Sequence, residues 1–201
     1  MVLTDLKDVA ERSTAPNIAL NAGLWEAAEG KKSGSCLALP LQWGCEEEET
    51  VVKTEGPYDL IICADCCYFG DVVGKSHPAN PTALVSSLAR QCFNTHADND
   101  AEKAKSSCVV LTSMEVRTTV AYESFCAAAR TQFPIVNDVS LETLPDDILP
   151  AGYREHHKFF LLCGGEKGLT RWDAMLQKQY RRSSRAIRKV KKKAAKSAAS
   201  P

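Results

Sequence analysis

The sequence predicts an α/β fold with a mostly parallel sheet that ends in an antiparallel hairpin. Apolar runs of strand length alternate with segments of helical periodicity across residues 1–166. The run at 58–65 is mostly apolar, which is typical of strands buried on both faces of a parallel sheet, and 106–114 is a second candidate for a buried strand. The last two strand candidates follow each other with no helix between them, which favours antiparallel pairing.

The elements follow in order from the N-terminus. MVLTD is predicted to be a very short strand ending at Asp5, and 7–23 suits a helix that Pro16 makes irregular or restarts. CLALPLQW at 36–43 is the next strand, and the acidic run CEEEET at 45–50 is expected to be a solvated loop. The remaining elements are strands at 58–65, 106–114, 134–142 and 157–165 and helices at 82–93 and 117–133.

Composition places the chain among soluble globular proteins. It has 201 residues, of which 44% are hydrophobic and 7% aromatic, and no apolar run approaches the roughly 18 residues of a membrane-spanning helix. The N-terminus does not resemble a secretory signal. The cysteines number nine, and most lie within apolar runs, so we expect them to be reduced in a cytoplasmic protein.

Charge divides the chain into an acidic body and a basic tail. Of 25 basic and 25 acidic residues, 171–201 holds 11 Lys and Arg but one acid, which leaves 14 against 24 in 1–170. We therefore expect one domain over 1–166 and a tail over 167–201 that is helical and then disordered. Such a tail is typical of RNA binding, of binding to acidic partners, or of nuclear or nucleolar targeting.

Polar or aromatic residues close three predicted strands. Ligands of such sheets bind at the carboxyl ends of the strands, which selects Asp5, Trp43 and the segment 65–68. Asp5 could accept hydrogen bonds from a ribose diol or cap the following helix, and Trp43 could pack on an adenine or serve as a hydrophobic anchor. Glu115 and Arg117 end a fourth strand, where we expect an ion pair.

The segment ADCCY raises a choice between a metal site and a polar cleft. Cys63 and Cys66 have a zinc-like spacing, but zinc needs a second pair of ligands that the sequence lacks, so we expect no metal. Asp65 and Tyr68 are then predicted to face a cleft, where a carboxylate could accept hydrogen bonds from an amine beside an aromatic wall.

The same motifs, taken in order, resemble a known family. LTD at 3–5, LQWG at 41–44, DLIICADCCY at 59–68 and LVSSLARQC at 84–92 are similar to the seven-strand, S-adenosylmethionine-dependent methyltransferases of family 16. That family includes protein-lysine methyltransferases. The resemblance covers roughly 1–166 and implies a Rossmann-like sheet, S-adenosylmethionine as cofactor and a lysine side chain of a protein as substrate.

The resemblance also assigns roles by position. It implies that Asp5 binds the ribose hydroxyls, that Trp43 flanks the adenine and that Ala64 contacts the cofactor through its backbone. It implies that Asp65 and Tyr68 form the catalytic, acceptor side of the site. In-line methyl transfer then depends mainly on positioning, and a desolvated pocket keeps the lysine amine neutral.

One part of the family pattern does not occur. The family begins with a strand that runs into a Gly-rich turn and lies in the middle of its sheet, and no G-x-G precedes Asp5. We therefore expect an N-terminally truncated member without that strand, whose own activity is an open question. A non-catalytic module that binds through the basic tail and a small-molecule N-methyltransferase remain as alternatives.

Overall fold

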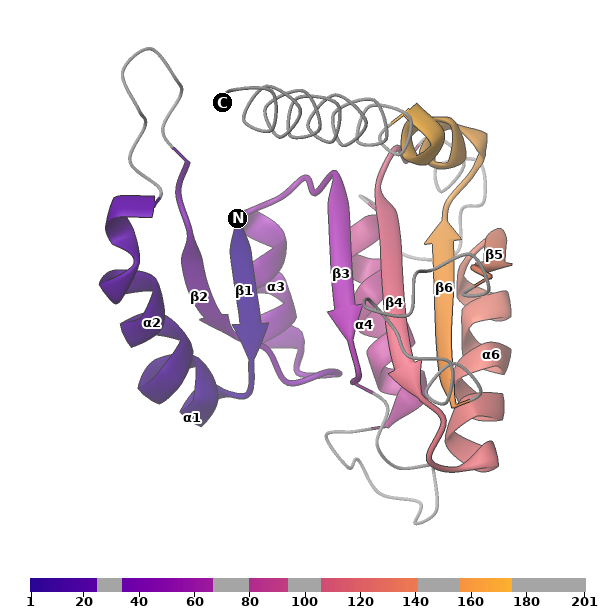
Figure 1. The fold of residues 1–201 in the computed structure, drawn as a ribbon, viewed down its shortest axis with the longest axis horizontal. Coiled ribbons are helices and arrows are strands. Elements are labelled where there is room, and N and C mark those ends of the chain that lie inside the picture. The colour runs from indigo at the N-terminus through magenta and orange to yellow at the C-terminus, as the bar shows by residue number, and fades with distance from the viewer. Residues whose placement is uncertain (25–33, 67–79, 94–105, 141–155, 175–201) are drawn as a thin grey trace, which may run out of the picture.

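The computed structural model describes 1–24, 34–66, 80–93, 106–140 and 156–174 (Figure 1). The strands in these ranges are β1 (Val2–Asp5), β2 (Leu37–Pro40), β3 (Leu60–Ala64), β4 (Val109–Glu115), β5 (Ile135–Asp138) and β6 (His157–Cys163). They form a two-stranded sheet of order β1-β2 and a four-stranded sheet of order β3-β4-β6-β5. None of the described helices is both long and apolar enough to cross a membrane.

Strand directions confirm the predicted fold class. β1 runs parallel to β2, and β3 runs parallel to β4. β6 is antiparallel to β5, as predicted for the terminal pair, and it enters the sheet between β4 and β5 so that it is antiparallel to both. The chain is therefore an α/β protein with a mixed, Rossmann-like arrangement of strands.

The hydrophobic core lies on the four-stranded sheet. Helices α4 (Pro81–Cys92) and α6 (Thr119–Gln132) pack behind it, as Figure 1 shows. The ring of Phe125 lies 5.4 Å from that of Phe160 on β6, and the rings of Phe93 and Phe133 lie 5.3 Å apart. All four side chains are almost completely buried, so this half of the molecule holds most of the buried apolar surface.

The segment after β1 is an irregular helix, as predicted. It comprises α1 (Lys7–Val9), a π-helical turn η1 (Ala10–Thr14) and α2 (Ala15–Leu20), and a 3₁₀ turn follows at Ala22–Leu24. Pro16 occupies the first turn of α2, where a missing N–H is tolerated. The helix therefore restarts at the proline.

The acidic run 45–50 is not a solvated loop, and that prediction is wrong. It begins helix α3 (Glu46–Thr54), whose first turn consists of four glutamates. Acidic side chains stabilise a helix N-terminus because its free N–H groups carry partial positive charge. Glu49 is also only 3% exposed, and burial of a single acid cannot be seen in a run of identical residues.

Residues 166–174 are helical and pack against one end of β3 and β4. Arg171 forms an ion pair of 2.7 Å with Asp59 and donates a hydrogen bond of 3.2 Å to Ser107. The domain boundary predicted at 166 falls at the start of this helix, and these contacts attach the helix to the body. The rest of the basic tail lies outside the described residues.

Candidate functional site

A groove of about 710 Å³ lies between β1 and β3, the facing strands of the two sheets. In Figure 1 these strands lie side by side with their arrowheads at the same end. Asp5 and Leu6 line the groove where β1 ends, Trp43 lines it after β2, and Ala64 and Cys66 line it where β3 ends. The carboxyl ends of three strands thus meet at one groove.

Asp5 presents a carboxylate to this groove. Its Oδ1 accepts a hydrogen bond of 2.8 Å from the backbone N–H of Leu6 at the start of α1. The side chain is exposed, and no contact within the described residues occupies Oδ2. Leu6 precedes α1, and no side chain caps this helix, so Asp5 does not cap it in the structure, while its second oxygen can accept a hydroxyl.

Trp43 is half-buried and packs against the hydrophobic core while it lines the groove. Two glutamates of α3 hold the backbone on either side of it. Glu48 accepts the N–H of Gln42 at 2.5 Å, and Glu49 accepts the N–H of Gly44 at 2.8 Å. Gly44 has φ +84°, a conformation that other residues rarely adopt, so the glycine makes the turn that directs its N–H to Glu49.

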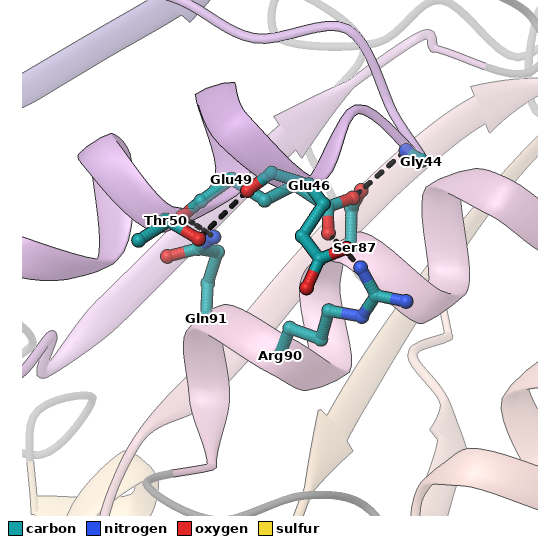
Figure 2. A network of polar contacts seen from close by, with 7 residues as sticks. All are labelled: Gly44, Glu46, Glu49, Thr50, Ser87, Arg90 and Gln91. Atoms are coloured by element: carbon teal, nitrogen blue, oxygen red, sulfur yellow. Dashed lines mark hydrogen bonds and ion pairs between the residues drawn. The ribbon is translucent and has the colours of Figure 1, made fainter.

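Glu49 is the centre of a buried polar network that sequence reasoning missed (Figure 2). Its carboxylate accepts hydrogen bonds from Ser87 and Arg90 of α4 as well as from Gly44. The side-chain amide of Gln91 donates to the backbone oxygen of Glu49 at 2.9 Å. The network therefore fixes the Trp43 loop to helix α4, which is part of the main core.

Asp65 lies at the edge of the groove and is already engaged. Its backbone adopts φ +50°, which an aspartate tolerates better than most residues. Oδ1 accepts the N–H of Glu115 at 3.2 Å, and Oδ2 forms an ion pair of 3.0 Å with Arg117. The predicted pair between Glu115 and Arg117 is present at 2.8 Å. Asp65 is not among the residues that line the groove, and Tyr68 lies outside the described residues.

Cys66, which the sequence singled out only as a possible metal ligand, lines the groove. Its thiol lies 3.3 Å from the carbonyl oxygen of Ala64. A hydrogen bond from the Cys63 side chain lowers the pKa of Cys66, while burial and the charges of Asp65 and Asp5 oppose that shift. The two-residue spacing between the cysteines was the available signal, and it suggested a metal site instead. Within the described ranges, no three His, Cys, Asp or Glu side chains are placed to hold a metal ion.

The groove fits part of an S-adenosylmethionine molecule. Its volume falls within the range typical of small-molecule sites, about 300–1,000 Å³. The carboxylate of Asp5 can accept hydrogen bonds from a ribose diol, and the indole of Trp43 offers an aromatic wall for an adenine. The backbone at Ala64 can contact the cofactor where β3 ends.

Comparison with known proteins supports the same family. No curated protein matches the chain. Residues 1–77 match the sequence model of the family described as lysine methyltransferase. The matched stretch contains β1, β2, β3 and all of the predicted cofactor residues, Asp5, Trp43 and Ala64. Over residues 1–77, this chain is therefore similar to the lysine methyltransferase family.

Proposed function

We propose that this chain is an S-adenosylmethionine-dependent protein-lysine N-methyltransferase that binds its cofactor at the carboxyl ends of β1, β2 and β3. One observation carries the proposal. Asp5, Trp43 and Ala64, which are far apart in sequence, line the same groove. The match to the lysine methyltransferase family over 1–77 supports the reaction and the class of substrate.

In this proposal the residues of the groove bind and orient the cofactor. Asp5 accepts the ribose hydroxyls through the carboxylate oxygen that is not bonded to the N–H of Leu6. Trp43 packs on the adenine and is held in place by Glu48 and Glu49. When bound, the cofactor supplies an electrophilic methyl group for in-line transfer to a neutral amine. Positioning of the two reactants provides most of the acceleration in such a reaction.

The acceptor side is proposed to include Asp65 and Tyr68. Asp65 forms an ion pair with Arg117, and both side chains are about 40% exposed. An incoming lysine would meet a carboxylate whose charge Arg117 already compensates. Arg117 would therefore limit how strongly Asp65 favours the charged form of the lysine, which must lose its proton before it attacks.

Calorimetric titration with S-adenosylmethionine tests the proposal. We expect measurable binding to the full chain and at least a tenfold loss of affinity in Asp5→Ala, because the substitution removes hydrogen bonds to a charged acceptor. Asp8→Asn is the matched control. Asp8 pairs with Arg12 at 2.8 Å and does not line the groove. The affinity of the Asp8→Asn variant for S-adenosylmethionine should therefore stay unchanged.

The proposal for this chain would be contradicted if millimolar S-adenosylmethionine gave no heat of binding and did not raise the unfolding temperature. Equal losses in Asp5→Ala and Asp8→Asn would show that binding depends on overall charge and not on the groove. Transfer of a labelled methyl group to lysine in a protein extract, but not to free small amines, would support the protein substrate over a small-molecule one.

A further inference from the structure

We propose that Cys63 and Cys66 form a redox-active pair at the groove, in which peroxide oxidises Cys66 and Cys63 then closes a disulfide with it. The pair lies where β3 ends, on either side of Ala64. Such a site requires two thiols in contact, of which one is open to solvent. The proposal concerns modification of the thiols themselves and does not depend on methyl transfer.

The turn after β3 brings the two thiols together. In a straight strand, residues three apart point to opposite faces of the sheet. The alternation is broken at Asp65, whose backbone adopts φ +50°. Cys63 belongs to the buried core, and Cys66 packs against that same core. The two side chains are in hydrogen-bond contact, so a disulfide would join groups that already touch.

The two thiols differ in exposure, and this difference assigns their roles. Both line the groove, but Cys63 is only 6% exposed whereas Cys66 is half-buried. The groove of about 710 Å³ admits a molecule as small as hydrogen peroxide. Cys66 therefore meets the peroxide first, and Cys63 stands behind it as the thiol that resolves the oxidised form.

The contact with Cys63 also activates Cys66. The S–H group of Cys63 donates a hydrogen bond to the sulfur of Cys66, which stabilises the thiolate and lowers the pKa of Cys66. Burial and the charges of Asp65 and Asp5 act in the opposite direction. Because the thiolate is the nucleophile, the same contact favours the first step of the reaction and supplies the second thiol.

The reaction proceeds in two balanced steps. The Cys66 thiolate attacks one oxygen of hydrogen peroxide, the O–O bond breaks, and hydroxide leaves and takes up a proton, so that Cys66 becomes a sulfenic acid. The sulfur of Cys63 then attacks the sulfur of Cys66, the S–O bond breaks, and water leaves with the thiol proton. Two thiols and one peroxide thus give one disulfide and two waters.

A second pair of thiols serves as a reference within the same molecule. Cys92 and Cys108 are also joined by a side-chain hydrogen bond, and Sγ of Cys92 lies 3.8 Å from the carbonyl oxygen of Cys108. These residues are 5% and 3% exposed, and neither lines the groove. If access through the groove decides reactivity, peroxide should oxidise Cys66 and spare this buried pair.

Mass spectrometry of the full chain after treatment with hydrogen peroxide tests the proposal. Free thiols are alkylated at successive times, and fragmentation of the peptides locates each bond. We expect a Cys63–Cys66 disulfide as the main product, with Cys66 losing its free thiol at least about tenfold faster than Cys92 or Cys108. Dithiothreitol should restore both thiols. The proposal would be overturned if Cys92 and Cys108 were oxidised as fast as Cys66, or if Cys66 paired instead with the adjacent Cys67.

The Cys63→Ala variant tests the role of the resolving thiol. Its Cys66 should stop at the sulfenic acid, so labelling by dimedone, which traps sulfenic acids, should rise at least about tenfold over the unchanged chain. Cys45→Ser is the matched control. Cys45 is also half-buried but does not line the groove, so its replacement should leave the yield of the disulfide unchanged.

Equal dimedone labelling of Cys66 in the unchanged chain and in Cys63→Ala would show that Cys63 does not resolve the sulfenic acid, which would overturn the proposal. Circular dichroism checks that the variant stays folded, because Cys63 is buried. If the variant did not fold, the mapping of bonds in the unchanged chain would still decide between the outcomes. None of these readouts needs S-adenosylmethionine, so failure here is distinct from failure of the proposed function.

Discussion

At the scale of single residues, Glu49 shows how a buried acid determines the shape of the site. Its carboxylate joins the N–H of Gly44 to Ser87 and Arg90 (Figure 2). Gly44 directly follows Trp43, so the network acts on the proposed adenine wall. The groove would therefore depend on a residue that lies behind it and does not line it.

We expect Glu49→Gln to lower the free energy of unfolding by about 2 kcal/mol. The amide keeps the shape but removes the charge that compensates Arg90, and its NH₂ faces other donors. Because Arg90 is half-exposed, water recovers part of the loss, and the cost stays below that of a fully buried pair. Urea denaturation measures the change.

Glu46→Gln is the control for this substitution. Glu46 stands in the same first turn of α3 but is exposed, so its contribution is limited to the helix dipole, about 0.3–1 kcal/mol. Equal destabilisation by the two substitutions would show that the buried network contributes nothing beyond a charge at the helix start.

Residues at strand ends could be predicted from the sequence, but their partners could not. Asp5 and Trp43, which the strand-end argument selected, line the same groove as Ala64, which only the family resemblance indicated. The ion pair between Asp65 and Arg117 joins residues from two strands, and no periodicity encodes such a distant pair. The same limit applies to Cys66, whose position at the groove depends on how the chain turns after β3.

At the scale of elements, apolar runs and helical periodicity located most strands and helices. The predicted strands at 58–65 and 106–114 correspond to β3 and β4, and the predicted helix at 82–93 corresponds to α4. Composition agrees with burial in β4 and α4, but the prediction that β3 is buried on both faces is wrong, because Ile62 in its middle is 68% exposed. The prediction of a loop at 45–50 was wrong because α3 begins with charged residues. Tertiary contacts fix this helix, and composition does not reveal them.

The docking of the 166–174 helix depends on Gly168. A Cβ at this position would lie 2.8 Å from the Cβ of Cys163 and 3.2 Å from the carbonyl oxygen of Cys108. We expect Gly168→Ala to lower stability by about 1–3 kcal/mol, since overpacking outweighs the gain of up to about 1 kcal/mol in helix propensity. Thermal unfolding measures the change, and loss of the Arg171–Asp59 pair should accompany it.

Gly34→Ala is the control for the docked helix. A Cβ at Gly34 would meet nothing within 4 Å, and its backbone does not require glycine. This substitution should be neutral or slightly stabilising, because alanine restricts the unfolded chain more than glycine does. If Gly168→Ala were equally neutral, the helix would not be packed against Cys108 and Cys163 in solution.

At the scale of the whole molecule, two parts differ strongly in burial. The N-terminal unit, which comprises β1, α1, η1, α2 and β2, has Ala10 as its one buried residue among the described ranges 1–24 and 34–40. The unit on the four-stranded sheet contains the aromatic core. Helix α3 connects the two parts, packing against α4, and the side chain of Lys53 donates to the carbonyl of Phe93 at 2.9 Å.

This asymmetry predicts that the N-terminal unit opens independently of the rest. Native-state hydrogen exchange should give an opening free energy for the amides of Leu3 and Leu39 at least about 2 kcal/mol below that for Val110 and Leu162, because regions with few buried apolar contacts open first. Equal opening free energies for the two pairs of amides, with equal dependence on denaturant, would contradict this prediction. They would show that both parts unfold as one cooperative unit.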